Sequence, residues 1–165
     1  MNQESFIIDE ILKAREERYL NKLKIEKHLK CIIELSLNVP GYPKVGFVWQ
    51  KVFNKCISAI EIAIPSKIVI YNIDSAGYYA LFNSNIELRE AKIRSCFIED
   101  KNEWGRIVDI DCSENGRKMS REEIGLKERK CFLCDNPHSI CITNKHHNLN
   151  ELKYKAYEMA QSLLF

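Results

Sequence analysis

Two aspartates on one expected strand carry the chemistry that this sequence shows most clearly. Residues 105–112 have the composition of a strand, and because strand side chains alternate, Asp109 and Asp111 point to the same face. Their Cα atoms lie about 7 Å apart on such a strand, so both carboxylates can converge on a hard cation such as Mg²⁺. Metal-assisted phosphoryl or nucleotidyl transfer needs such a pair, since the ion neutralises charge on the transferring phosphate.

An ordinary half-exposed strand with an acidic outer face is the alternative explanation for these two aspartates. Aspartate is disfavoured within strands, however, because it fits a pleated, half-buried surface poorly. Here two aspartates interrupt a run of isoleucine and valine beside Arg106. The sequence therefore points to phosphoryl or nucleotidyl transfer as the class of reaction.

Basic residues in the N-terminal part are candidate phosphate contacts. Arg15 falls in the middle of the apolar side of an expected helix, and Arg18 follows three residues later, so the two guanidiniums could fork onto a phosphate. An internal salt bridge or a side chain that reaches water is the alternative for Arg15. Lys44 begins a second expected helix, whose N-terminus favours anions, although a solvated lysine is an equally ordinary interpretation.

A cluster of cysteines and histidines in the C-terminal part has the composition of a metal site. Cys131, Cys134 and Cys141, followed by His146 and His147, offer three thiolates and an imidazole. This is the ligand chemistry of a closed tetrahedral zinc site, for which His147 is our choice of histidine. A reduced cluster without metal and thiol redox chemistry are the alternatives. The remaining cysteines lie singly among apolar neighbours, as small core residues do: Cys31, Cys56, Cys96 and Cys112.

The elements that must position these residues have a mixed α+β order. Hydrophobic periodicity predicts helices over residues 5–28, 44–63, 86–91 and 148–164. Composition and turn signals predict strands over residues 31–37, 67–73, 78–82, 94–98 and 106–112. Residues 131–147 form the Cys/His loop, in which we expect His138 to be a surface residue.

Length and charge limit the number of domains and the kinds of partner. The chain has 165 residues, of which 45% are hydrophobic and 29% charged, so we expect one domain over residues 1–165. Its 25 basic and 23 acidic residues nearly balance, so no overall positive electrostatic potential would attract nucleic acid or a membrane surface. We find no secretory leader and no long apolar segment, so we expect a soluble, cytoplasmic protein.

An ordered series of motifs resembles the citrate lyase holo-[acyl-carrier-protein] synthase family, known as CitX. The dense part comprises residues 105–111, Ser120-Arg121, residues 129–134, Cys141 and His147. A thinner resemblance extends to Arg15-x-x-Arg18 and to the Asn38-x-Pro40-Gly41 loop before Lys44. In the family pattern a proline tends to follow that glycine directly, whereas here Tyr42 precedes Pro43.

The resemblance implies an activity and a set of roles. Family members transfer the phosphoribosyl-dephospho-CoA group from triphosphoribosyl-dephospho-CoA to a serine of the apo acyl carrier protein (gamma) subunit of citrate lyase, releasing pyrophosphate. Asp109 and Asp111 would bind Mg²⁺. The possible phosphate contacts are Arg15, Arg18, Lys44, Arg106 and Arg121. By analogy, the fold would be a single nucleotidyltransferase-like domain with a mixed sheet and flanking helices. The candidates for a general base are Asp74, Glu99 and Asp100.

Two alternatives to this function remain open from the sequence. One is the similar transferase that serves the acyl carrier protein of malonate decarboxylase, which uses the same kind of prosthetic group. The other is a non-catalytic, zinc-stabilised module that docks a partner through Lys127, Arg129 and Lys130. Loss of function on removing the cysteines, but not the aspartates, would favour the binding module.

Overall fold

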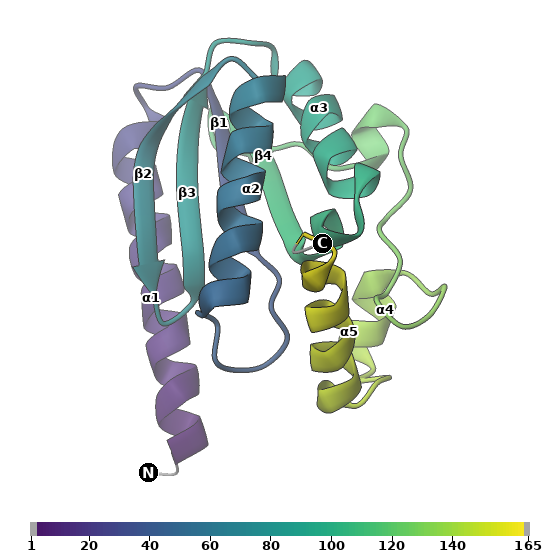
Figure 1. Ribbon diagram of the computed structural model, residues 1–165. Coiled ribbons are helices and arrows are strands. Elements are labelled where there is room, and N and C mark those ends of the chain that lie inside the picture. The colour runs from purple at the N-terminus through teal and green to yellow at the C-terminus, as the bar shows by residue number, and fades with distance from the viewer. Residues whose placement is uncertain (1–2, 164–165) are drawn as a thin grey trace.

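The computed structural model describes residues 3–163, in which one antiparallel sheet is flanked by helices (Figure 1). The strands are β1 (Cys31–Leu37), β2 (Ser66–Asp74), β3 (Gly77–Ser84), β4 (Val108–Glu114) and β5 (Arg117–Lys118), in the spatial order β2-β3-β1-β4-β5. The helices are α1 (Gln3–Glu26), α2 (Phe47–Ala63), α3 (Leu88–Lys101), α4 (His138–Thr143) and α5 (Leu149–Gln161). Two short 3-10 helices are η1 (Glu103–Ile107) and η2 (Glu122–Ile124).

The α+β class is confirmed, but the prediction of a mixed sheet is wrong. Each of the four strand pairs within residues 3–163 is antiparallel. The β2–β3 hairpin explains part of this arrangement, because a tight turn at Asp74–Gly77 joins neighbouring strands in opposite directions. The last helix begins at Leu149, after the Asn148 cap, and residue 164 of its predicted range lies outside the described residues.

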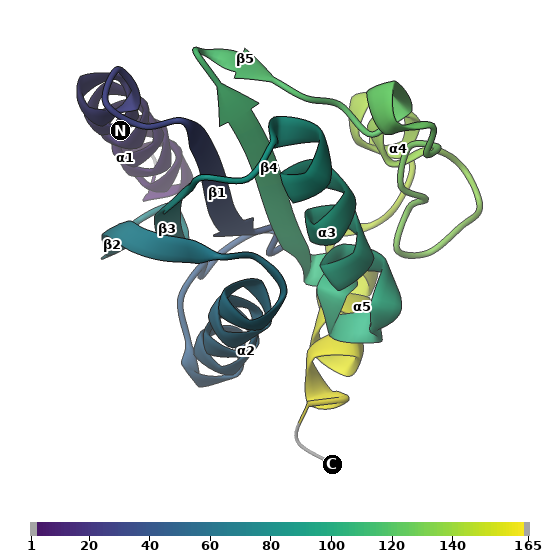
Figure 2. The ribbon, with the colours of Figure 1, turned by 90° about the horizontal axis from the view of Figure 1, so that it is seen from above.

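The main core lies between the sheet and helices α2, α3 and α5, whereas α1 lies on the opposite face (Figure 2). Strand alternation produces this division, since Ile33 and Leu35 of β1 belong to the main core and Ile32 points to the α1 side. Helix α2 has the predicted periodicity and buries Trp49 and Phe53, among other residues. Among the helices of residues 3–163, none has the length and apolarity needed to cross a bilayer.

Helix α3 corrects two predictions at once. Residues 86–91 and 94–98 were expected to be a short helix and a strand, but α3 runs without a break from Leu88 to Lys101. Its buried face includes Lys92 and Glu99 as well as apolar side chains, so the apolar residues alone do not show a helical period. Because Lys92 and Glu99 are on the buried face, the sequence pattern did not predict one continuous helix.

Helix α1 is present, but its apolar side does not face the sheet. Leu12 and Tyr19 are 56% and 61% exposed, whereas Ala14 and Arg18 are buried. Arg18 donates to Asp74 at 2.5 Å and to the Gly77 carbonyl at 2.8 Å, which ties α1 to the β2–β3 turn. This ion pair determines which side of the helix meets the sheet.

Gly105 allows η1 to pack closely against the end of α3, directly before β4. A Cβ atom at this position would lie 2.4 Å from the carbonyl oxygen of Glu99 and 2.7 Å from that of Ile98. No real side chain tolerates these distances to backbone atoms, so glycine is required. The contact fixes where β4 begins relative to α3.

Replacing Gly105 by alanine should lower stability by about 1–3 kcal/mol, the usual cost of overpacking. Urea unfolding monitored by circular dichroism would measure the loss. The control is Ser58→Ala on the exposed surface of α2, where a change within about 0.5 kcal/mol is expected. Equal stability of the Gly105→Ala variant and the wild type would show that η1 does not need this close contact.

Candidate active site

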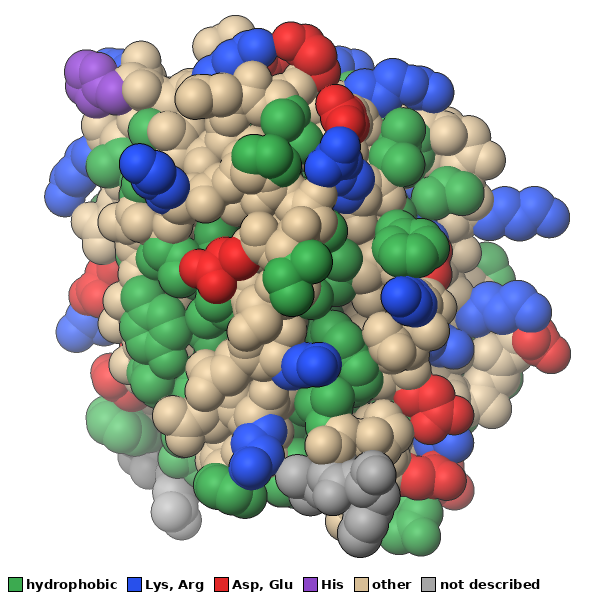
Figure 3. Space-filling model, turned by 45° about the horizontal axis from the view of Figure 1, so that its top comes forward, with side chains coloured by type: hydrophobic (Ala, Val, Ile, Leu, Met, Phe, Trp, Pro, Cys, Tyr) green, Lys and Arg blue, Asp and Glu red, His purple; other side chains and the backbone are tan. Residues whose placement is uncertain are grey.

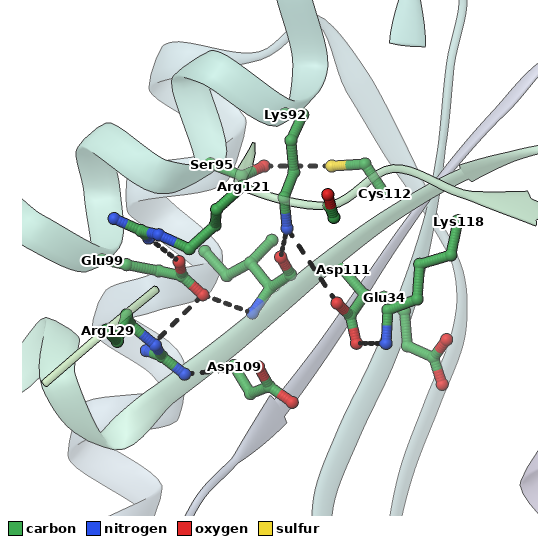
Figure 4. A network of polar contacts seen from close by, with 12 residues as sticks. Glu34, Lys92, Ser95, Glu99, Asp109, Asp111, Cys112, Lys118, Arg121 and Arg129 are labelled. Carbon is green, nitrogen blue, oxygen red and sulfur yellow. Dashed lines mark hydrogen bonds and ion pairs between the residues drawn. The ribbon is translucent and has the colours of Figure 1, made fainter. Parts of the chain in front are cut away.

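The two aspartates of β4 lie on the same face of the sheet, beside a group of charged residues (Figure 4). Val108, Ile110 and Cys112 are fully buried in the main core, while Asp109 and Asp111 alternate with them and are half-buried. The register of β4 is set by its pairing with β1. A slip by one residue would turn both carboxylates into the core.

Strand β1 adds a third carboxylate that sequence reasoning missed. Glu34 is the Cα partner of Asp111, and Ser36 is the partner of Asp109, so these side chains share one face. Lys22 of α1 donates to Glu34 at 2.7 Å. The signal in the sequence was a single acidic residue in a mainly apolar strand, at a position that alternates with buried neighbours.

Beyond the short pairing with β5 at Ser113 and Glu114, the outer edge of β4 is satisfied by charged side chains rather than by another strand. The Ile110 N–H donates to Glu99 Oε1 at 2.8 Å, and Lys92 Nζ donates to the Ile110 carbonyl at 3.3 Å. One step along the edge, Arg129 donates to the Val108 carbonyl at 2.7 Å. These contacts place two cations and a carboxylate next to the aspartates.

Glu99 is the most deeply buried carboxylate of the group. It accepts a hydrogen bond from Arg121 at 2.9 Å and lies 3.7 Å from Arg129. Burial raises the pKa of Glu99 above its ordinary value, and Arg129 opposes this shift. Arg121 also donates to Asp100 at 2.5 Å. Two of the three candidate bases, Glu99 and Asp100, are thus paired with the same guanidinium, and the third, Asp74, is paired with Arg18.

The two aspartates of β4 have different partners. Arg129 lies 3.4 Å from Asp109, whereas Lys118 contacts Asp111 directly and Lys92 is 4.0 Å away from it. Burial and repulsion by Asp111 raise the pKa of Asp109. Although burial opposes it, the contact with Asp111 raises the pKa of Lys118. Carboxylates that repel each other beside several cations form a site suited to a metal ion together with an anion.

An open cavity of about 350 Å³ lies over these residues. Its charged lining consists of Lys92, Glu99, Asp109, Asp111, Lys118, Arg121, Glu122, Glu128 and Arg129. Figure 3 shows that basic, acidic and apolar side chains are interspersed over the face in view. The cavity likewise combines both signs of charge, with four basic and five acidic residues in its lining.

The structure separates the predicted phosphate contacts into three groups. Arg121 lines the cavity beside the aspartates. Arg106 donates to the carbonyls of Lys130 and Cys131 at 2.8 and 2.6 Å, which holds the Cys/His loop. The third group, Arg15, Arg18 and Lys44, belongs to the region around α1, away from the lining of this cavity.

The residues around α1 have other partners. Arg15 is exposed, and Arg18 is held by Asp74. Lys44 donates to the Val39 carbonyl at 2.5 Å, and burial together with Arg15 lowers its pKa. Arg129, which sequence reasoning weighed only as a partner contact, takes the place of these residues at the cavity.

The four residues predicted to bind zinc come together. The ligand atoms of Cys131, Cys134, Cys141 and His147 all lie within 4.8 Å of one another. Cys134 Sγ is 3.5 Å from Cys141 Sγ and 3.3 Å from His147 Nε2. A tetrahedral zinc with Zn–S bonds of about 2.3 Å separates its ligands by about 3.8 Å, so this Cys₃His cluster fits such an ion.

The backbone around Cys131 favours the thiolate form of this residue. Although burial raises it, the N–H groups of Leu133 and Cys134 lower the pKa of the Cys131 thiol below its ordinary value. The Cys131 N–H donates to the Asn136 carbonyl at 2.8 Å and closes the loop. These contacts favour the thiolate form, which is the form that binds metal.

His138 is half-buried, so the expectation of a surface residue is wrong. Its ring stacks on Phe132 with centroids 6.0 Å apart, and its Nε2 atom lies 3.4 Å from Asn38 Nδ2. Its backbone N–H donates to the Arg129 carbonyl at 2.9 Å. The segment that carries His138 therefore connects the cysteine cluster with the cavity beside the aspartates.

Comparison with known proteins covers both sites. The model of the apo-citrate lyase phosphoribosyl-dephospho-CoA transferase family matches residues 6–163. A Streptococcus pyogenes serotype M3 protein, described as a probable apo-citrate lyase phosphoribosyl-dephospho-CoA transferase, is 25% identical over 159 residues, covering 91% of this chain and 83% of the relative. An Escherichia coli strain SE11 protein, described as an apo-citrate lyase phosphoribosyl-dephospho-CoA transferase, is 25% identical over 152 residues, covering 88% and 83%.

Replacing Arg121 by glutamine should destabilise the protein by about 3 kcal/mol at pH 7, because Glu99 would remain as a buried charge without its nearest partner. The loss should shrink at pH 5. A carboxyl whose pKa is raised on folding binds its proton more tightly in the folded state, so stability rises as the pH falls toward its ordinary value of 4.5.

Urea unfolding at both pH values would test this expectation. The matched control is Arg117→Gln, because Arg117 pairs with Glu123 but its side chain is 64% exposed. Such an exposed pair contributes only about 0–1 kcal/mol. Equal losses in the two variants, or a loss at Arg121 that does not change with pH, would contradict the role assigned to the buried pair.

Proposed function

The chain belongs to the apo-citrate lyase phosphoribosyl-dephospho-CoA transferase family, and we propose that the cavity beside Asp109 and Asp111 is its active site. As a member of this family, it transfers phosphoribosyl-dephospho-CoA to the acyl carrier subunit of apo-citrate lyase. We propose triphosphoribosyl-dephospho-CoA as the donor. A serine oxygen of the carrier attacks the phosphorus that bears the ribosyl group, a phosphodiester forms, and pyrophosphate leaves.

One observation carries the choice of site: two carboxylates on one face of β4 lie within a cavity that four basic residues also line. Asp109 and Asp111 would hold Mg²⁺, with Glu34 as a further carboxylate on the neighbouring strand. When bound, the ion neutralises charge on the transferring phosphate. Burial and repulsion by Asp111 raise the pKa of Asp109, and such a cation would relieve the repulsion.

The cations of the cavity would bind the triphosphate. Lys118 and Arg129 already contact the two aspartates, so they lie beside any phosphate that shares a metal ion with these carboxylates. Arg121 lines the same cavity and is held in place by Glu99. Guanidiniums bind phosphate oxygens in a bidentate manner, which orients the leaving pyrophosphate.

The alternatives fit these observations less well. The family model names citrate lyase, which supports that carrier over the carrier of malonate decarboxylase. A non-catalytic module would need Arg129 at a docking surface, but its guanidinium contacts Val108 and Asp109 inside the cavity. A cytoplasmic location is part of the proposal, because all seven cysteines are free thiols, which a reducing compartment preserves.

We also propose that the Cys₃His cluster holds zinc with a structural role. Three thiolates and one imidazole complete a tetrahedral shell, so no position remains for water or substrate phosphate. The cluster joins the residue 131–136 loop to α4 and to the start of α5. Zinc would therefore stabilise the segment that carries Arg129 into the active site.

Asp109→Asn and Asp111→Asn should each reduce transfer by more than about 100-fold, because asparagine keeps the shape but loses the anionic ligand; this loss corresponds to about 2.7 kcal/mol of barrier. The assay incubates the protein with apo carrier, donor and Mg²⁺, and follows carrier mass and released pyrophosphate. Asp9→Asn, on the exposed surface of α1, is the control and should keep full activity. Losses below tenfold at both positions would place the metal elsewhere.

His147→Ala should lose zinc and unfold at a lower temperature, because the free energy of metal binding is coupled to folding. His146→Ala is the matched control, since His146 is exposed and lies outside the four-residue cluster. Cys134→Ser should behave like His147→Ala. Elemental analysis and thermal unfolding of freshly purified, reduced protein measure both effects. If the wild-type protein contains well below one equivalent of zinc and is fully active, the four residues of the cluster contribute only packing.

A further inference from the structure

A second cavity, of about 440 Å³, lies between the Asn38–Pro40 loop and the C-terminal helices. Its walls are mainly apolar and come from Pro40, Phe132, Ile142, Leu149 and Leu152. This volume lies within the range of about 300–1,000 Å³ that is typical of small-molecule sites. Polar groups in the lining include the Asn38 amide, the His138 imidazole and the Lys145 ammonium.

This apolar cavity continues toward the active site. A small hollow of about 10 Å³ has Arg129 in common with the active-site cavity. The same hollow has Asn38, Phe132 and His138 in common with the apolar cavity. The three hollows therefore follow one another, with Arg106 beside the middle one. The middle hollow is too small to enclose part of a ligand, so a ligand that reaches both larger cavities would cross the surface between them, with phosphates at one end and an apolar group at the other.

We propose that the apolar cavity binds the adenine ring of the donor while the triphosphate lies beside Asp109 and Asp111. This inference rests on the proposed function, which supplies the donor. Adenine has apolar faces and a polar edge that both donates and accepts hydrogen bonds. Phe132 and His138 stack on each other with an interplanar angle of 24°, and both rings line the cavity, so an adenine ring can extend this stack. The Asn38 amide nitrogen lies 3.4 Å from His138 Nε2, and the amide oxygen can accept a hydrogen bond from the adenine amino group.

The chemistry of the walls favours adenine over the pantetheine arm, which is the other apolar part of dephospho-CoA. A flat ring gains from stacking on aromatic side chains, whereas a flexible arm loses conformational freedom when it is bound. Burial, together with Arg129, lowers the pKa of His138, so the imidazole is neutral at pH 7 and its face is available for stacking. The cysteine cluster forms the remaining wall through Cys131, Cys141 and His147.

Dephospho-CoA is the probe for this site, because it carries the adenine ring without the triphosphate. The double variant Ile142→Ser and Leu149→Ser should bind dephospho-CoA about tenfold more weakly than the wild type by calorimetry. Both side chains are exposed, so the fold should persist, and zinc content and thermal unfolding would verify it. The matched control is Ile140→Ser with Ile62→Ser, which removes the same kind of side chain outside the cavity and should bind as the wild type does.

Competition identifies the occupant. Adenosine monophosphate should displace dephospho-CoA from the wild type, whereas pantetheine at the same concentration should not. Displacement by pantetheine alone, or unchanged binding in the double variant, would overturn the inference. The transfer assay separates this outcome from failure of the proposed function. If the wild-type protein modifies the carrier and the double variant binds dephospho-CoA as tightly as the wild type does, only the adenine site is refuted.

Discussion

The buried carboxylate of Glu99 makes the contacts on which the proposed active site depends. It accepts the Ile110 N–H at the edge of the sheet and binds Arg121 from the opposite side. Without it, a buried backbone donor would be left unpaired and a guanidinium would lose its anchor. The backbone of Glu99 is fixed as well, because Gly105 packs against its carbonyl. One residue thus couples the end of α3, the edge of β4 and the cations of the cavity.

The two halves of the site are connected through the chain between Arg129 and His138. Arg129 reaches β4, while its carbonyl accepts the His138 N–H. Arg106, from η1 before β4, donates hydrogen bonds to the carbonyls of Lys130 and Cys131. The cysteine cluster therefore shapes a segment that is also held from the active-site side. Stability of the Cys/His segment and the position of Arg129 in the cavity are consequently linked.

Much of the fold could be predicted from the sequence wherever burial follows a regular period. The buried residues of helix α2 and strand β4 follow a clear period. The spacing of the cysteines indicated the cluster whose residues lie together in the structure. Helix α3 was mispredicted because Lys92 and Glu99 occupy its buried face. The pairing of Arg18 with Asp74 joins residues 56 positions apart, and no local pattern in the sequence indicates it. Glu34 joined the site only through the register of β1 against β4.

The charged side chains along β4 also affect how the sheet can associate with other chains. Exposed strand edges are templates for pairing with a further strand, and proteins protect them in different ways. The outer edge of β4 is closed, because β5 pairs with Ser113 and Glu114, while Glu99, Lys92 and Arg129 occupy hydrogen-bonding groups of Val108 and Ile110. At the other end of the sheet, β2 has only β3 as a neighbour and is interrupted by an irregularity between Ile68 and Ile70. A bulge of this kind breaks the regular row of donors and acceptors, so neither edge offers an uninterrupted template for aggregation.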